Sequence, residues 1–368
     1  MRSALPVTRL PGPNDLAGLA CEESIESRII IGTGTQWQLR HGPFTDDDFH
    51  RLPDRDWTLL VQAVDHFLPE VADLLDYFRF LPNWRIDDVM VSYASPGGSV
   101  GPHFDYYDVF LIQGSGQRLW KIGQHCDASS ALLSHPELRL LDTFAPSAEY
   151  LLEPGDILYL PPGIAHWGIS QSDDCMTYSV GFRAPTYGEV LASLCDDLLS
   201  KNSDDDRYRD PSSDIDSARC GEIDPAVVDT LQIRLNELIN NRDALVRSFG
   251  RMMTETRYDN AESVREAAAP DTFAEIVDAS SILRRDPAAR FAYWQSATGE
   301  PRDCVDLFVN GRMYRCEGDA AVLARLLCNH RRYSGDQLHN VIAGNSDAEV
   351  LLLDLVNQQY IFLDDDCD

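Results

Sequence analysis

Short apolar runs separated by glycine and proline fill the middle of the chain, from Asp87 to Phe182. Such runs predict short β-strands joined by tight turns. The strands are expected at residues 89–93, 109–112, 118–122, 149–152, 157–160, 165–170 and 177–182. Residues 113–116, Gln-Gly-Ser-Gly, are interpreted as a hairpin turn between the second and third of these strands. This pattern is typical of a double-sheet jelly roll or a small barrel.

The N-terminal part has a different periodicity. Between residues 44 and 80 the pattern is interpreted as helical, with a helix start at Thr45, and apolar side chains recur at three- and four-residue spacing. Pro69 interrupts the recurrence, so two short helices are expected there. Residues 1 to about 30 are proline-rich and then acidic, and no element is predicted from them.

A second helical region is expected from Tyr187 to about Arg285. Asp224-Pro225 is a typical helix start, because the aspartate accepts from free backbone N–H groups and proline suits the first helical position. An apolar stripe follows, at Val228, Leu231, Leu235 and Leu238. This stripe is expected either to pack against its own domain or to form a dimer interface.

The last segment, roughly 290 to 368, has its own organisation. Asn310-Gly311 between two apolar runs is a strong hairpin signal. Helices are expected at 321–329, from 334, and at 347–356, before a closing strand at 360–362. This order resembles a winged-helix module. The acidic residues 364–366 and a third helix without basic side chains argue against direct DNA binding.

Composition and charge narrow the class of protein. The chain has 368 residues, of which 44% are hydrophobic, and its formal net charge is −29. Such a surface repels nucleic acid and favours a basic partner, although the charge can equally serve solubility alone. The nine cysteines include no Cys-x-x-Cys pair, which indicates a reducing compartment. No run approaches the roughly 18 apolar residues of a membrane span, so a cytoplasmic protein is expected.

Two histidines and one carboxylate are the candidate metal ligands. Gly97 precedes His103-x-Asp105, and Gly155 precedes Pro161-x-Gly163-x-x-His166, which are the two halves of a cupin-type pattern. Residues i and i+2 of a strand share a face, so His103 and Asp105 can both enter a barrel, and His166 can arrive from a facing strand. This ligand set suits non-haem Fe(II), since three positions stay open for O2 and a 2-oxo acid.

A second His-x-Asp, at His125 and Asp127, lacks such a frame and is interpreted as a solvated loop. If the co-substrate is 2-oxoglutarate, its far carboxylate needs a cation. Arg118 can supply two parallel hydrogen bonds, whereas Lys121 is expected on the opposite face of the same strand. The hydroxyl groups that could add a hydrogen bond are those of Ser179, Thr177 and Tyr93.

These motifs resemble those of the JmjC-domain ribosomal oxygenases. The resemblance rests on Gly-Pro-His103-x-Asp105-x-x-Asp108, Arg118-x-Trp120, Tyr-x-Pro-Pro-Gly-x-x-His166 and Tyr-Ser-Val-Gly-Phe182-Arg-Ala-Pro. It is greatest for the bacterial branch of that family. One departure, Trp167 after the distal histidine, is expected to alter the pocket wall.

The resemblance implies an α+β protein with a double-stranded β-helix, or jelly-roll cupin/JmjC, core. The expected parts are the catalytic domain at 1–185, a helical dimerisation segment at 186–289 and a winged-helix-like domain at 290–368. It also implies that His103, Asp105 and His166 hold Fe(II) and that Arg118 binds 2-oxoglutarate.

The implied reaction is hydroxylation, with O2, of an arginine β-carbon in a basic large-subunit ribosomal protein. Candidate residues for holding that arginine are Asp108, Tyr106 and Tyr107, for each of which a structural role is an equal alternative. Two other functions stay open. One is the same chemistry on a histidine or an N-methylated residue, and the other is a cupin that only binds a partner.

Overall fold

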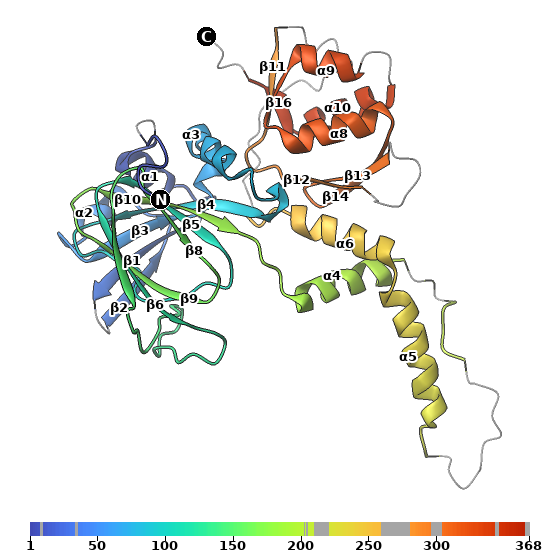
Figure 1. Ribbon diagram of the computed structural model, residues 1–368, viewed down its shortest axis with the longest axis horizontal. Coiled ribbons are helices and arrows are strands. Elements are labelled where there is room, and N and C mark those ends of the chain that lie inside the picture. Colours follow the sequence, from blue (N-terminus) through green and yellow to red (C-terminus); the bar gives the residue numbers. More distant parts are fainter. Residues whose placement is uncertain are drawn as a thin grey trace.

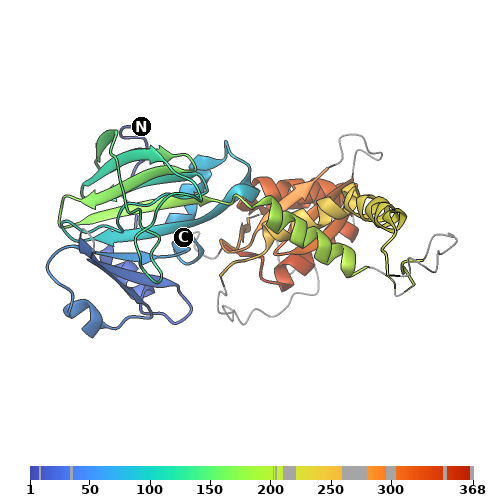
Figure 2. The ribbon, with the colours of Figure 1, turned by 90° about the horizontal axis from the view of Figure 1, so that it is seen from below.

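The computed structural model describes residues 1–7, 10–33, 36–201, 203, 205–209, 221–258, 280–295, 304–342 and 346–364. Figure 1 shows an N-terminal β-rich body, a helical segment and a C-terminal body of helices and strands. Seen from below, the β-rich body lies at one end of an elongated molecule (Figure 2).

The N-terminal body begins with two helices and three strands. In chain order its first elements are α1 (Pro13–Leu19), β1 (Ser27–Thr33), β2 (Gln36–His41), α2 (Asp46–His50) and β3 (Trp57–Val61). Short turns of helix follow, namely η1 (Val64–His66), α3 (Pro69–Ala72), η2 (Asp73–Phe78) and η3 (Asn83–Arg85). The strands of the barrel are β4 (Ile86–Ala94), β5 (Val109–Ser115), β6 (Arg118–His125), β7 (Ala148–Leu152), β8 (Ile157–Leu160), β9 (Ile164–Ser170) and β10 (Cys175–Phe182).

Two antiparallel sheets form this body. Their strand orders are β2-β1-β3-β4-β10-β5-β8 and β7-β6-β9. On one face of the larger sheet, side chains pack with α1 and the short turns η1 to η2 in a continuous apolar core that includes Ile29, Val89, Ile112 and Val180. All seven strands predicted from the β-rich pattern are present, so the double-sheet jelly roll is confirmed.

The predicted hairpin at residues 113–116 is wrong. Strand β5 pairs with β10 and β8, whereas β6 pairs with β7 and β9, so the two strands lie in different sheets. The chain crosses from one sheet to the other at Gly116, whose φ is +62°. Glycine permits this backbone in a hairpin and in a sheet-to-sheet crossing alike, so the local sequence could not distinguish them.

The sequence pattern did not predict three strands of the N-terminal part, namely β1, β2 and β3. Of these, β3 lies within the region 44–80 that was interpreted as helical. Leu59 and Val61 of β3 are buried in the core between β1 and β4. A run of four to five apolar residues is too short for its periodicity to distinguish a buried strand from a helix. The predicted helix start at Thr45 is confirmed, because the Asp48 carboxylate accepts from the Thr45 backbone N–H at 3.0 Å.

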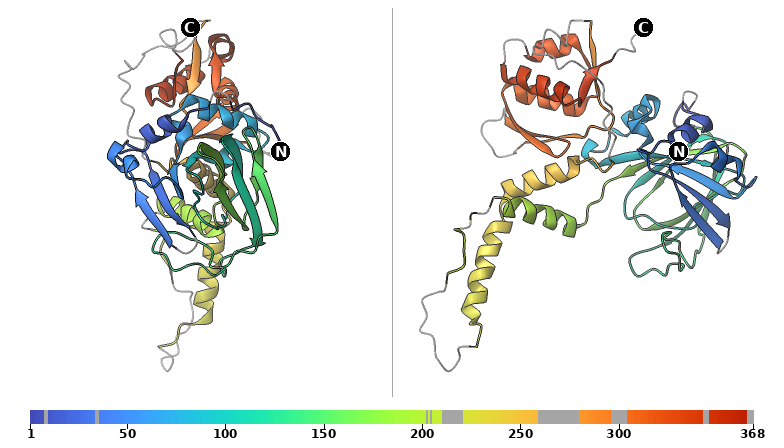
Figure 3. Two further views of the ribbon diagram at one scale, coloured as in Figure 1. Left: turned by 90° about the vertical axis from the view of Figure 1, so that its left-hand side faces the viewer. Right: turned by 180° about the vertical axis from the view of Figure 1, so that it is seen from behind.

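The helical segment contains α4 (Tyr187–Leu199), α5 (Pro225–Ile239) and α6 (Arg242–Thr254). As predicted, the Asp224 side chain caps α5 by accepting from the backbone N–H of Ala226. Helices α4 and α6 pack together, while α5 projects away from both bodies (Figure 3). No residue of α5 is buried, and Val228 and Leu235 are each 55% exposed. Within the described residues, the apolar stripe is therefore not covered by its own domain.

The C-terminal body packs three helices against two small sheets. Its elements are β11 (Ile282–Arg285), β12 (Phe291–Trp294), β13 (Cys304–Val309), β14 (Arg312–Glu317), α8 (Asp319–Asn329), β15 (Arg332–Ser334), α9 (Gly335–Ile342), α10 (Ser346–Asn357) and β16 (Ile361–Leu363). The predicted hairpin is confirmed, since β13 and β14 pair and both Asn310 and Gly311 have positive φ. Of the predicted acidic tail, residues 365 and 366 lie outside the described residues.

A partly buried ion pair with Arg290 joins the C-terminal body to the barrel at Asp87, the second residue of β4. Its carboxylate accepts from Arg183 Nε at 2.8 Å and lies 3.2 Å from Arg290 Nη2. Arg290 also donates to the backbone oxygen of Ile86 at 2.6 Å. In the described part of the chain, no helix is long and apolar enough to span a membrane.

Candidate metal centre

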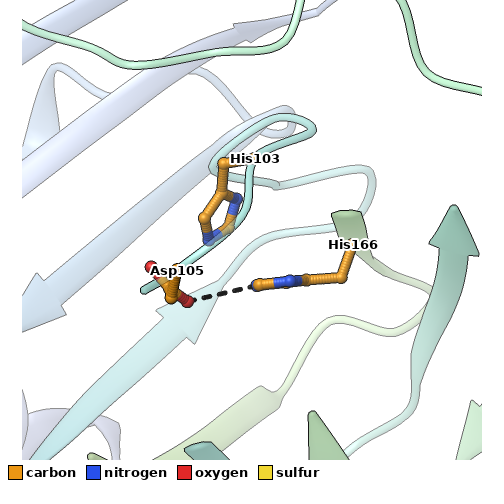
Figure 4. Close-up of side chains that lie close together, drawn as sticks. All are labelled: His103, Asp105 and His166. Atoms are coloured by element: carbon orange, nitrogen blue, oxygen red, sulfur yellow. Dashed lines mark ion pairs between the residues drawn. The ribbon is translucent and has the colours of Figure 1, made fainter. Parts of the chain in front are cut away.

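The structure brings His103, Asp105 and His166 together, as predicted. His103 and Asp105 follow the glycine loop after β4, and His166 lies in β9. Two backbone hydrogen bonds fix the loop to the strand, from His103 N to His166 O and back from His166 N to His103 O. One ligand atom from each side chain lies within 4.8 Å of the others, and Figure 4 shows the three side chains grouped together.

The hydrogen bonds of the two imidazoles prepare them as ligands. Nδ1 of His103 lies 3.0 Å from the Gly101 carbonyl oxygen, and Nδ1 of His166 lies 3.0 Å from that of Ile164. A carbonyl only accepts, so each Nδ1 carries the proton and each Nε2 is left with a free lone pair. Burial, with a smaller effect from His103, lowers the pKa of His166 to about 4. His166 is therefore neutral near pH 7, which is the form that binds a metal.

Glycine is required in the loop that aims the distal histidine. Gly163 has φ of +78°, and a Cβ there would lie 2.9 Å from the backbone oxygen of Cys126. Its N–H donates to the backbone oxygen of Asp105 at 2.8 Å. The Pro-Pro-Gly turn is thereby attached directly to the segment that carries the carboxylate ligand.

Arg118 lines the cavity into which the three side chains face. This cavity has a volume of about 540 Å³. Only 3% of Arg118 is exposed, and its Nε donates to Cys175 Sγ at 3.4 Å. Among the described residues, its buried Nη2 has no hydrogen-bond partner. A guanidinium buried in this way fits an anionic ligand, because an unpaired buried donor is costly and a carboxylate would satisfy it.

Of the three hydroxyl groups predicted as hydrogen-bond partners of the co-substrate, two lie on side chains that line this cavity. Ser179 and Thr177, on β10, both line it, and the Thr177 hydroxyl donates to Gln113 Oε1 at 3.3 Å. Tyr93 does not join them. It follows Ser92, which lines the cavity, and strand alternation therefore turns Tyr93 to the other face of β4. Its hydroxyl donates to the Asp173 backbone oxygen at 2.8 Å.

Two of the three candidate substrate residues line the cavity. Tyr106 and Tyr107 lie at its exposed side, and the pKa of Tyr107 is raised by desolvation and by the nearby carboxylate of Asp105. Asp108 does not line the cavity, which favours the structural role given as its alternative. Its carboxylate accepts from Arg85 Nη2 at 2.9 Å and from the Tyr159 hydroxyl at 2.7 Å, a structural arrangement.

One carboxylate that does line the cavity, Asp88, was missed. Its Oδ2 accepts from Gln62 Nε2 at 2.8 Å, from the Ala63 backbone N–H at 2.9 Å and from the Tyr258 hydroxyl at 3.3 Å. Burial and the neighbouring carboxylates of Asp65 and Asp87 raise the pKa of Asp88 to about 6. A signal was available, because Asp88, Met90 and Ser92 alternate along β4 and all line the cavity.

The remaining predictions near the site concern side chains outside it. His125 and Asp127 are exposed, and Asp127 accepts from the Ser129 backbone N–H at 2.8 Å, so their placement in solvent is confirmed. Lys121 lies on the face of β6 opposite Arg118, with its Nζ 3.4 Å from a Glu149 carboxylate oxygen. Trp167 does not alter the pocket wall: it does not line the cavity, and its indole donates to Ser99 Oγ at 2.8 Å.

The fold and the site together define a class of protein. A double-sheet cupin barrel that aims two histidines, one carboxylate and a buried arginine into one cavity is the arrangement of a JmjC-type oxygenase. The chain matches the JmjC domain family over residues 73–190 and the ROXA-like winged helix family over residues 237–362. These two matches account for the barrel and for the C-terminal body.

Relatives of known name match half of the chain or more. The chain is 41% identical over 253 residues to "Ribosomal protein uL16 3-hydroxylase" of Escherichia coli, an alignment that covers 67% of this chain and 65% of the relative. It is 38% identical over 194 residues to "Probable ribosomal oxygenase" of Haemophilus influenzae, covering 52% of this chain and 48% of the relative. The aligned part therefore spans somewhat less than two thirds of the length of the E. coli relative and about half of the length of the H. influenzae relative.

Solved structures extend the likeness to nearly the whole chain. The structure of E. coli YcfD, described as a ribosomal oxygenase in complex with cobalt and 2-oxoglutarate, is 33% identical, with a TM-score of 0.79, and covers 96% of this chain and 91% of that one. Another structure of E. coli YcfD is 32% identical with a TM-score of 0.83, and covers 99% of this chain and 94% of that one. The chain belongs to the JmjC-domain ribosomal oxygenases that carry a ROXA-like winged helix.

Proposed function

We propose that the chain is an Fe(II)- and 2-oxoglutarate-dependent oxygenase that hydroxylates the β-carbon of an arginine in the large-subunit ribosomal protein uL16. The observation that carries this proposal is the convergence of His103, Asp105, His166 and the buried Arg118 on one cavity. The names of the E. coli relatives, a uL16 3-hydroxylase and a protein solved with cobalt and 2-oxoglutarate, support the substrate and the co-substrate.

In this proposal the residues of the chain hold and orient the reactants. His103, Asp105 and His166 would bind Fe(II) on one side, and Arg118 would bind the far carboxylate of 2-oxoglutarate. When bound, the metal and co-substrate supply the oxidising chemistry that inserts one oxygen atom into a C–H bond and converts 2-oxoglutarate to succinate and CO2. Burial of Arg118 and His166 excludes water around the reacting groups.

The substrate arginine would enter beside Asp88. A guanidinium cation compensates a buried carboxylate and binds it through parallel hydrogen bonds. Tyr107 and Met90 line the same cavity and offer apolar surface for the methylene groups of that side chain. The net charge of −29 favours approach of a basic ribosomal protein, and we expect the enzyme to act in the cytoplasm, where ribosomes are made.

The test is to incubate purified protein with Fe(II), 2-oxoglutarate, O2 and recombinant uL16 from the same organism. We expect succinate to form and uL16 to gain one oxygen atom, located on an arginine by fragmentation mass spectrometry. An added oxygen on histidine, or loss of a methyl group, would select the alternative oxygenase reaction. Absence of any turnover with intact uL16 or ribosomes would favour a protein that only binds its partner.

Replacement of Asp88 by asparagine is expected to weaken substrate binding selectively. A lost charged hydrogen-bond partner costs about 1.5–3 kcal/mol, so the KM for uL16 should rise at least about tenfold. The KM for 2-oxoglutarate should stay within about twofold, because Arg118 rather than Asp88 would bind it. Asp108→Asn is the matched control and should leave both constants nearly unchanged; a similar rise in both variants would contradict the assignment.

The rate should also depend on pH through Asp88. Its raised pKa of about 6 reflects burial beside Asp65 and Asp87, with Tyr258 and Gln62 facing it as hydrogen-bond donors. Below this pH the carboxyl is neutral and cannot pair with a guanidinium, so kcat/KM for uL16 should rise as pH increases through about 6 and then level. We expect Asp88→Asn to remove this rise; a profile unchanged by the substitution would exclude Asp88 as its origin.

We further propose that α5 forms a homodimer interface. An exposed apolar stripe on a projecting helix is typical of a surface that a partner covers. Sizing should give a particle of twice the 41.3 kDa chain mass. The double substitution Leu231→Glu and Leu235→Glu should yield a monomer, whereas Val350→Glu, an equally apolar and exposed position on α10, should not. A monomeric wild-type protein would exclude the dimer.

A further inference from the structure

Strand β6 carries two buried nitrogen donors that have no hydrogen-bond partner in the part of the chain that the structure describes. One is Nη2 of Arg118 and the other is Nε1 of Trp120. Residues two positions apart on a strand share a face, and both side chains line the cavity of the candidate metal centre. The guanidinium carbon of Arg118 lies 5.8 Å from the centre of the Trp120 ring. The proposed function uses the first donor and leaves the second without a role.

Packing holds the Trp120 ring in place between the metal ligands and the arginine. Only 4% of Trp120 is exposed. On one side it lies against Gly168, its partner in β9, where a Cβ atom would come within 2.7 Å of the ring. On another side, the centre of the His166 ring is 5.9 Å away. The indole therefore cannot turn to solvent, and its N–H is energetically costly to leave without an acceptor.

A second nitrogen of the arginine head, Nε, is already engaged. Nε of Arg118 donates to the Sγ of Cys175, which is fully buried and also accepts from Gln113 Nε2 at 3.5 Å. The guanidinium is thus fixed at one edge, and a carboxylate must approach its Nη atoms. An ionised carboxylate offers about four acceptor positions, so one arginine does not exhaust it.

We propose that the Trp120 indole N–H is a second donor to the carboxylate of 2-oxoglutarate that Arg118 binds. This inference rests on the proposed function, since it requires 2-oxoglutarate in the cavity. Trp120 is then a co-substrate-binding residue, and its indole fixes the orientation of the carboxylate relative to the metal ligand His166. A ring without the N–H, such as phenylalanine, would preserve much of the packing and lose only this contact.

The test follows the indole N–H directly by NMR, with Zn(II) as a diamagnetic metal and 2-oxoglutarate as the added ligand. The chain has six tryptophans, and the Trp120 signal is identified by its absence from the Trp120→Phe spectrum. We expect this signal to move downfield on addition of 2-oxoglutarate, as a charged acceptor forms a hydrogen bond. The Trp167 signal should not move, because that indole already donates to Ser99.

Calorimetry on the same samples separates this inference from the proposed function. Trp120→Phe should raise the Kd for 2-oxoglutarate about tenfold, and Trp167→Phe should leave it unchanged. Wild-type protein that binds 2-oxoglutarate with an unmoved Trp120 signal would overturn the inference alone. Wild-type protein that does not bind 2-oxoglutarate would overturn the proposed function. If Trp120→Phe does not fold, the five other Trp→Phe variants assign the signal by elimination.

Discussion

Replacement of His103 by alanine should reduce turnover of 2-oxoglutarate and hydroxylation of uL16 to below about one hundredth of the wild-type rate. Even a group that only orients a metal ligand typically contributes 10–100-fold to metal affinity or activity, and His103 would be a ligand itself. Its Nε2 has no substitute, because the other imidazole of the cluster, His166, is already required. The measurement is succinate formation, together with Fe(II) affinity by titration.

His125→Ala is the matched control for this prediction. It removes the same side chain from the other His-x-Asp of the chain, at an exposed position outside the cluster. We expect wild-type metal affinity and turnover in this variant. Full activity in His103→Ala would disprove the metal assignment, and equal losses in both variants would point to a general effect on folding.

Replacement of Arg118 by alanine should raise the KM for 2-oxoglutarate by about 30–100-fold and the KM for uL16 by less than about threefold. The reason is that a buried, charge-assisted pair of hydrogen bonds would be lost, worth about 2–3 kcal/mol. The two constants are measured by varying each reactant while the other is saturating.

Lys121→Ala is the control for charge on the same strand. Lys121 lies on the opposite face of β6 and is paired with Glu149, so its removal should affect neither constant. Equal effects of Arg118→Ala on both reactants would contradict a specific role in binding the co-substrate. Such a result would instead indicate that loss of Arg118 disturbs the barrel as a whole.

Much of the site could be predicted because its signals are local. His103 and Asp105 lie two residues apart, and the spacing from Gly163 to His166 places the distal histidine at the start of a strand. The placement of Arg118 and Lys121 on opposite faces followed from strand alternation alone. The rule was not applied to Tyr93. Because Ser92 lines the cavity, alternation along β4 places the neighbouring Tyr93 on the opposite face of the strand.

The errors and the open alternatives concern contacts between distant segments. Asp108 follows the metal motif closely, but Arg85 and Tyr159 bind its carboxylate, and neither partner is visible from its neighbours in sequence. Asp88 enters the cavity because β4 lies between β3 and β10 in the larger sheet. The prediction of a hairpin between β5 and β6 was wrong for the same reason, because the whole sheet decides which strands pair.

The dimer and the roles of the site residues remain predictions that substitution and sizing experiments test, and the domain boundaries also remain predictions. For the fold, the confirmed strands and the Asn310-Gly311 hairpin depended on turn residues whose backbone preference is intrinsic. Such preferences need no tertiary partner, and they are therefore readable in a single sequence.

The sequence by itself determined the ligand types, their spacing and the glycine turns that aim them, because these are properties of adjacent residues. Only the tertiary structure decided that His103 and His166 meet through a pair of backbone hydrogen bonds. It alone also showed that Asp88 rather than Asp108 reaches the cavity, and that Trp120 has an unsatisfied donor beside Arg118. Burial and hydrogen-bond satisfaction depend on every segment packed around a group, so they exist only once the two sheets have closed.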